Sequence, residues 1–151
     1  MIKAAKYHGV QVSFDTNLRP ALWPSEEVMR ETINYLASLA DIVLPGFGEG
    51  KILTGFDTPE EIADFYLKQG AKAAIVKLGT KGSFVKTETE EFYAPAYVVD
   101  HVVDTVGAGD GFAVGTVTGR LEGLSWQDAV RRGAAIGALQ VQVEGDNEGL
   151  P

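Results

Sequence analysis

Residues 104–112 read Asp104-Thr105-Val106-Gly107-Ala108-Gly109-Asp110-Gly111-Phe112. The stretch before them, residues 97–103, is rich in β-branched residues and predicts a strand, whereas residues 108–121 predict a helix. Small residues at a helix start leave backbone N–H groups unpaired, and the helix dipole favours negative charge at the same place. The sequence therefore predicts an anion-binding loop between a strand and a helix.

Asp110 stands at the end of this loop. A carboxylate there would repel a bound anion if it served as one more ligand, so its position favours the role of a base beside a phosphate. An anion site with an adjacent proton acceptor is what phosphoryl transfer to a hydroxyl requires.

The composition is that of an ordinary globular protein: 151 residues, 45% hydrophobic and 23% charged. The net charge of −8 disfavours nucleic acid and anionic membranes as partners. The absence of cysteine excludes disulfides, thiolate metal sites and cysteine nucleophiles. The chain shows no signal-peptide pattern and no apolar segment of membrane-spanning length, so we expect a soluble, cytoplasmic protein.

Strand and helix patterns alternate along the chain, which predicts parallel βαβ units and a single α/β domain over residues 1–151 with a mainly parallel sheet in three layers. A polar antiparallel pair is expected at one edge. Besides residues 97–103, the predicted strands are residues 10–14, 41–44, 73–76, 83–86 and 91–94, and the predicted helices are residues 1–8, 25–40, 58–69, 108–121 and 125–143.

Polar or glycine-rich segments follow four predicted strands: Asp15–Arg19, Gly46–Glu49, Lys77–Gly82 and Asp104–Asp110. Each alone is typical of a turn, because Gly and Asp are common turn residues. Ligands of open α/β sheets, however, bind at the carboxyl ends of the strands. Four such segments at one edge therefore favour a binding site.

Two familiar nucleotide-binding patterns do not fit. The dinucleotide fingerprint G-x-G-x-x-G fails at Phe112 in one glycine-rich segment and at Lys51 in the other. The P-loop pattern fails because Gly50-Lys51 is followed by Ile52 and not by Ser or Thr. A nicotinamide enzyme and a P-loop ATPase are thus disfavoured.

The pattern Asp-Thr-x-Gly-Ala-Gly-Asp-x-Phe at residues 104–112 resembles the signature of the ribokinase-like (PfkB) sugar kinases. Residues 13–23 (SFDTNLRPALW) and 145–151 (GDNEGLP) are similar to the 2-keto-3-deoxygluconate kinase branch. The resemblance covers essentially the whole chain, yet family members are about twice as long. It implies the C-terminal portion of a three-layer ribokinase-like fold: the nucleotide-binding and catalytic half, without the N-terminal half and its dimerising lid.

The resemblance also implies residue roles. Asp110 would accept the proton of the sugar hydroxyl and contact the substrate, while the amides at residues 107–109 would hold the charge that develops on the phosphoryl group. Asn17 would reach the nucleotide, and Ala134, where the family often has Asn, would offer the adenine only apolar contact. The nucleotide-binding residues implied in this way are Asn17, Lys77, Leu78, Gly79, Thr80, Lys81, Gly82, Gly107, Ala108, Gly109 and Ala134.

Three further residues have alternatives that the sequence leaves open. Arg19 would bind an anionic substrate, since guanidinium pairs with carboxylates bidentately, but a surface ion pair is the alternative. Asp146 matches a substrate-contacting Asp of keto-deoxy sugar kinases, or is a turn acid. Glu49 matches the acid of the family's Asn-x-x-Glu motif, which organises Mg²⁺ through water, although Gly46 occupies the Asn position. Its alternative is a solvated acid at a helix start.

We therefore expect an ATP- and Mg²⁺-dependent kinase that transfers the γ-phosphoryl group to the terminal primary hydroxyl of 2-keto-3-deoxygluconate. The expected partners are a sugar acid and ATP, with a homo-oligomer for the full-length form. One alternative is another ribokinase-like kinase, such as a fructokinase. The other is a truncated nucleotide-binding fragment that has no catalytic activity by itself.

Overall fold

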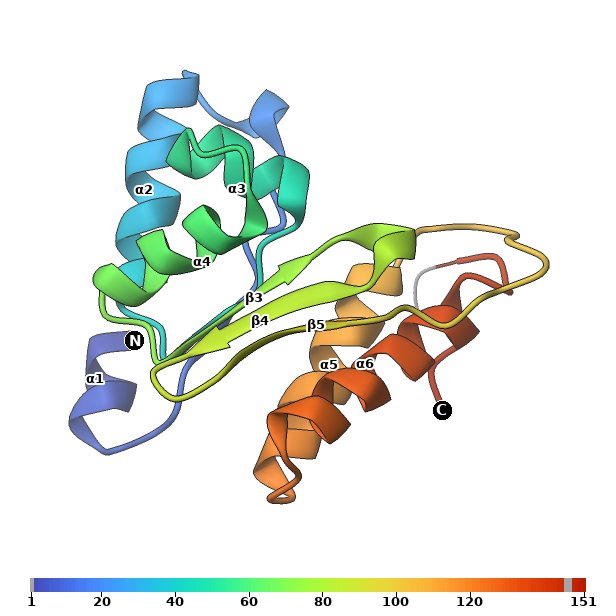
Figure 1. Ribbon diagram of the computed structural model, residues 1–151. Helices are drawn as coiled ribbons and strands as arrows, with labels where there is room; N and C mark the ends of the chain where they lie inside the picture. The colour runs from blue at the N-terminus through green and yellow to red at the C-terminus, as the bar shows by residue number, and fades with distance from the viewer. Residues whose placement is uncertain (1, 146–147) are drawn as a thin grey trace. The chain divides into compact units, whose positions relative to one another are not determined.

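The computed structural model describes residues 2–145 and 148–151 (Figure 1). Helices and strands alternate along the chain, so the predicted α/β class is confirmed. Over the described residues, no helix combines the length and apolar character needed to cross a membrane. The elements are α1 Ile2–Tyr7, β1 Ser13–Phe14, η1 Pro20–Leu22, α2 Glu26–Ser38, β2 Ile42–Val43, α3 Phe47–Thr54, α4 Pro59–Lys68, β3 Ala73–Lys77, η2 Gly79–Lys81, β4 Ser83–Thr87, β5 Glu91–Ala94, α5 Ala108–Leu121 and α6 Trp126–Gln140.

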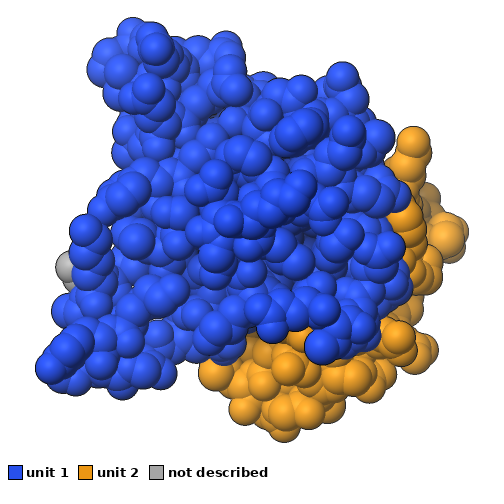
Figure 2. Space-filling model, turned by 60° about the vertical axis from the view of Figure 1, so that its left-hand side comes forward, with its two compact units in different colours: residues 1–77, 84–92 blue, residues 78–83, 93–151 orange. Residues whose placement is uncertain are grey.

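The chain divides into two compact units, which Figure 2 draws in different colours. Unit 1 comprises residues 1–77 and 84–92, and unit 2 comprises residues 78–83 and 93–151. Each unit is described by itself below, and the single domain expected from the sequence stays a prediction.

The sheet has the strand order β1-β2-β3-β4-β5. The first three strands are parallel, with Ser13 beside Ile42 and Ile42 beside Ala73. Only residues 88–90 connect β4 to β5, which is too short for a parallel crossover, so this neighbouring pair is antiparallel as expected. The carboxyl ends of β1, β2 and β3 consequently point to the same edge of the sheet.

Capping side chains set the helix starts of unit 1. Ser25 Oγ accepts a hydrogen bond from the Val28 amide at 3.2 Å, and Thr58 Oγ1 accepts one from the Glu61 amide at 3.3 Å. Both caps stand at the first residues of the helices predicted over residues 25–40 and 58–69. The strands β2 and β3 are buried along nearly their full length, which is the expected pattern for a parallel sheet.

Helix α3 is absent from the sequence-based expectation, because its glycines read as a turn. The packing of α3 against α4 explains why position 50 is a glycine. A Cβ on Gly50 would lie 2.8 Å from Ile62 Cγ2, so the missing side chain lets α3 lie directly against α4. Tertiary packing here overrides a weak local helix preference.

In unit 2, α5 and α6 pack closely through small residues. A Cβ on Gly115 would lie 2.8 Å from Gly133 Cα, and one on Gly119 would lie 3.0 Å from Ala129 Cα. The two backbones can approach this closely only because side chains are lacking at the contact.

The strand predicted at residues 97–103 is wrong: this segment has no regular secondary structure. Its end is held instead by Val141, the residue after α6, because the amides of Val103 and Asp104 donate to the Val141 carbonyl at 2.8 and 3.3 Å. A β-branched sequence favours extended backbone but cannot supply the neighbouring strand that a sheet ladder needs.

Candidate functional site

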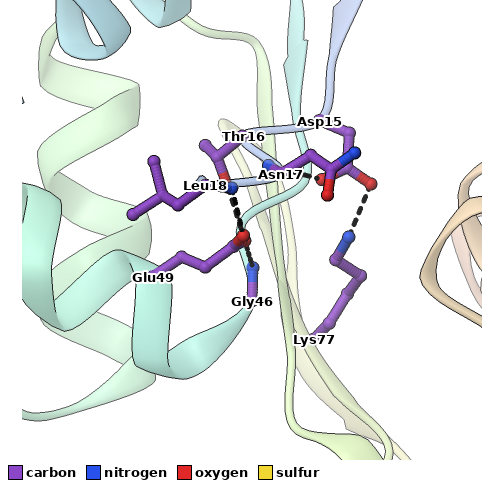
Figure 3. Close-up of polar contacts among 7 residues, drawn as sticks. All are labelled: Asp15, Thr16, Asn17, Leu18, Gly46, Glu49 and Lys77. Atoms are coloured by element: carbon purple, nitrogen blue, oxygen red, sulfur yellow. Dashed lines mark hydrogen bonds and ion pairs between the residues drawn. The ribbon is translucent and has the colours of Figure 1, made fainter. Parts of the chain in front are cut away.

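Glu49 joins the loop after β1 to the start of α3 (Figure 3). Its Oε2 accepts hydrogen bonds from Thr16 Oγ1 at 2.7 Å and the Gly46 amide at 2.8 Å. Its Oε1 accepts one from the Leu18 amide at 2.6 Å. Glu49 is therefore not the freely solvated acid of the alternative reading.

The surroundings of Glu49 favour its ionised form. Burial by itself would raise the pKa of Glu49, but the three hydrogen bonds that it accepts, together with the charge of Lys77, hold the pKa below its usual value. Thr16, the donor of one of these bonds, is only 4% exposed. The carboxylate is thus a fixed anion that ties the loop in place.

Asn17 and Arg19 lie on the same loop. Asn17 is exposed and has φ +36°, a left-handed conformation that Asn tolerates better than most residues. Arg19 is also exposed, and its Nη1 donates to the Leu18 carbonyl at 3.0 Å. No described carboxylate pairs with Arg19, so the surface ion pair considered as its alternative is not formed within the described chain.

Lys77 ends β3, and its Nζ lies 2.5 Å from Oδ2 of Asp15, the first residue after β1 (Figure 3). The other carboxylate oxygen of Asp15 accepts the Asn17 amide at 3.3 Å. Unit 1 thus brings Asn17, Glu49 and Lys77 to the carboxyl edge of the parallel strands, where ligands of such sheets bind.

Residues 78–82, in unit 2, form a closed turn around η2. The Leu78 amide donates to the Gly82 carbonyl at 2.8 Å, and the Gly82 amide donates to the Gly79 carbonyl at 3.0 Å. Gly82 has φ +97°, and a Cβ there would meet the Ala96 amide nitrogen at 2.8 Å, so no other residue fits. At Gly79, in contrast, nothing lies within 4 Å of a Cβ position, which leaves the backbone open to a ligand.

Residues 107–110 begin α5 in unit 2. Gly107 has φ +75°, the left-handed conformation that lets the chain turn sharply into the helix. The Ala108 amide donates to the Thr105 carbonyl at 3.4 Å, a long bond. Among the described residues, none accepts a hydrogen bond from the amides of Gly107, Gly109 or Asp110.

Asp110 is exposed in the first turn of α5. No ion pair with a described residue holds its carboxylate. The helix start thus combines unused amides with a free carboxylate, which is the arrangement that phosphoryl transfer to a hydroxyl needs.

Two predicted site residues remain. Ala134 is half-buried in α6. Asp146 lies outside the described residues, and its predicted role stays a prediction. Gln140, the last residue of α6, donates to the Gly145 carbonyl at 2.8 Å and accepts the Gly149 amide at 3.0 Å.

Comparison with known proteins identifies the family. The pfkB family of carbohydrate kinases matches residues 1–151. The chain belongs to this family.

Among pfkB relatives, the 2-dehydro-3-deoxygluconokinase of Bacillus subtilis (strain 168) is 59% identical over 143 residues, which are 95% of this chain and 44% of that protein. The solved structure of a PfkB protein from Polaromonas sp. JS666 has a TM-score of 0.86 at 48% identity, covering 93% of this chain and 46% of that one. A ribokinase II of E. coli in complex with ATP and Mg²⁺ has a TM-score of 0.89 at 33% identity, covering 99% and 48%.

The expected ribokinase-like fold is confirmed by these structural likenesses. The chain spans less than half the length of the pfkB relatives named here. At Gly46 and Ala134 the chain differs from the Asn residues that the resemblance described in the sequence analysis implies.

The sequence analysis did not single out Asp15 and Thr16 as site residues. Both belong to the polar segment after the first predicted strand, which was the available signal. Their individual roles depend on Lys77 and Glu49, which lie far away in the sequence and close in space.

Proposed function

We propose that this chain is the nucleotide-binding and catalytic half of an ATP-dependent sugar kinase that phosphorylates 2-keto-3-deoxygluconate, also called 2-dehydro-3-deoxygluconate. The observation that carries the kinase assignment is the start of α5, where an exposed carboxylate on Asp110 follows amides that donate to no described residue. The choice of sugar acid is supported by the name of the Bacillus subtilis relative.

In the proposed reaction, Asp110 accepts the proton of the substrate's primary hydroxyl as that oxygen attacks the γ-phosphorus of ATP. The bond from the γ-phosphorus to the β,γ-bridging oxygen breaks, and ADP leaves with its electron pair. The amides of Gly107 and Gly109 hold the negative charge on the transferred phosphoryl group. Arg19 pairs with the carboxylate of the sugar acid.

The residues that would contact the nucleotide fit an anionic ligand. Lys77 supplies a cation. The backbone amides of Gly79 and Thr80 donate to no described residue and are therefore available to a ligand. Asn17 offers an exposed amide side chain. Ala134 offers adenine an apolar contact.

Magnesium would neutralise the phosphates of the nucleotide. Over residues 2–145 and 148–151, no group of three His, Asp or Glu side chains forms a metal cage. The oxygens of Glu49 already accept three hydrogen bonds. This donor set fits an ion bound chiefly by phosphate oxygens and water, with Glu49 acting through a water molecule.

Two measurements on this chain test the proposal. Isothermal titration with Mg-ATP should show binding, and a coupled assay should show ADP formation stimulated by 2-keto-3-deoxygluconate and not by fructose. Stimulation by fructose alone would favour a fructokinase. Absence of nucleotide binding would contradict the kinase assignment.

A second candidate, a nucleotide-binding fragment that does not turn over by itself, is favoured by the length of the relatives. Nucleotide binding without ADP formation would support it. For the full-length form we propose a cytoplasmic homo-oligomer.

A further inference from the structure

Asp15 lies between the two unit 1 residues that the proposed function assigns to the nucleotide (Figure 3). One oxygen contacts the Lys77 ammonium at 2.5 Å, and the other accepts the Asn17 amide at 3.3 Å. The Asp15 and Lys77 side chains are 19% and 18% exposed, so this is a largely buried ion pair.

The pair spans the carboxyl edge of the sheet. Asp15 follows β1 directly and Lys77 ends β3, while β2 lies between these strands. The Lys77 backbone is fixed by its own bond, since its amide donates to the Pro45 carbonyl after β2 at 2.8 Å. Asp15 therefore determines where the flexible end of the lysine side chain points.

The Asp15–Lys77 ion pair is expected to contribute little to the stability of the fold. Burial raises the pKa of Asp15 above its usual value, although the charge and hydrogen bond of Lys77 act in the opposite direction. Buried ion pairs of this kind often contribute little net stability, because desolvation offsets the attraction. A carboxylate at a phosphate site is also unfavourable unless a cation neutralises it.

We propose that Asp15 is a positioning residue for nucleotide binding: it holds the Lys77 ammonium and the left-handed backbone of Asn17 ready for the phosphates, without contacting the ligand. The inference rests on the proposed function. It assigns to Asp15 an effect that depends on the phosphates and acts through Lys77.

Asp15→Asn tests this role, because it preserves the acceptor for the Asn17 amide and removes the charge that fixes Lys77. We expect the affinity for Mg-ATP to fall by about tenfold, the effect of one charge-assisted hydrogen bond. The affinity for adenosine, which lacks phosphates, should not change. Both dissociation constants are measured by titration calorimetry on this chain.

Matched variants separate positioning from general structure. Asp57→Asn removes the acid of the exposed Lys51–Asp57 pair in the same unit and should leave both affinities unchanged. Asp15→Asn combined with Lys77→Met should bind Mg-ATP no more weakly than Lys77→Met alone, because both act through one ammonium. Asp15→Glu, which retains the charge, should recover part of the loss and provides the test should Asp15→Asn not fold.

The outcomes are distinct. If the unaltered chain does not bind Mg-ATP, the proposed function fails and this inference fails with it. Two results would overturn the positioning role alone, provided that the unaltered chain binds Mg-ATP. In the first, Asp15→Asn binds Mg-ATP as tightly as the unaltered chain or more tightly. In the second, its affinity for adenosine falls by the same factor as its affinity for Mg-ATP.

Discussion

The Thr16 hydroxyl donates a hydrogen bond to Glu49 across 2.7 Å, although the two residues are 33 positions apart. This contact links the loop that bears Asn17 to the first turn of α3. Because Thr16 is buried, the bond lies where water competes poorly with it. Glu49 thereby serves the shape of the loop as well as any role toward a metal ion.

The first prediction concerns Glu49 and pH. Its pKa is lower in the folded chain than in the unfolded one, whose ordinary value is 4.5, so the unfolded state binds more protons as the pH falls through that value. The stability that Glu49 contributes is present above that pH and is lost on acidification. Glu49→Gln should therefore lower the free energy of unfolding at pH 7. It should also make that free energy fall less between neutral and acid pH.

Urea unfolding at a series of pH values measures this effect. Glu88→Gln, at an exposed position in the turn between β4 and β5, is the control and should preserve the original pH dependence. An unchanged pH dependence in Glu49→Gln would show that the carboxylate is not held ionised by its donors.

The second prediction concerns Asp110. Asp110→Asn should lower the rate of sugar-dependent ADP formation by about 100-fold or more, because the amide cannot accept the hydroxyl proton. Nucleotide affinity should change little, since the side chain is exposed and pairs with no described cation. Coupled assays and calorimetry measure the two quantities, with the exposed Asp100→Asn as control. Retention of most of the turnover would remove Asp110 from the role of base.

The third prediction concerns the contact between α5 and α6. Gly115→Ala should destabilise the chain by about 1–3 kcal/mol, because its Cβ would lie 2.8 Å from Gly133 Cα and overpack the interface. Gly48→Ala, in α3, has nothing within 4 Å of the new Cβ and should stabilise slightly, as Ala does in helices. Denaturant unfolding compares the two. Equal effects would mean that the interface is looser than the structure shows.

The fourth prediction concerns Asp41, whose side chain is only 7% exposed. It accepts the Val12 amide at 2.9 Å and lies 3.1 Å from Lys72 Nζ. Burial would raise the pKa of Asp41, but the Val12 and lysine interactions outweigh it and lower the pKa. Asp41→Asn should cost about 1–3 kcal/mol of stability, as loss of a buried charged partner does.

Denaturant unfolding at pH 7 measures this cost. The control is Asp57→Asn, because Asp57 pairs with Lys51 at 2.7 Å while its side chain remains 79% exposed. Exposed ion pairs contribute little, so this variant should unfold almost as the unaltered chain does. Similar losses in both variants would indicate that burial of Asp41 does not decide its contribution.

The local chemistry of the sequence was enough to predict most of the helices and strands. Ser25 and Thr58 mark helix starts because their hydroxyl oxygens accept backbone amides that the first helical turn leaves unpaired. The strand predicted at 97–103 was wrong, since extended preference alone does not provide a hydrogen-bonding partner. Helix α3 was missed because the reason for its Gly50 lies outside the local sequence. Ile62, on another helix, occupies the place where a Cβ at position 50 would lie.

The candidate site divides in the same way. The run at 104–112 determined by itself that a helix starts with small residues followed by an acid, because these properties depend on neighbours in the chain. Only the tertiary structure decided that Glu49 binds Thr16 and that Asp15 faces Lys77. Those pairs are 33 and 62 residues apart, and the sheet that brings them together depends on burial spread over the whole of unit 1.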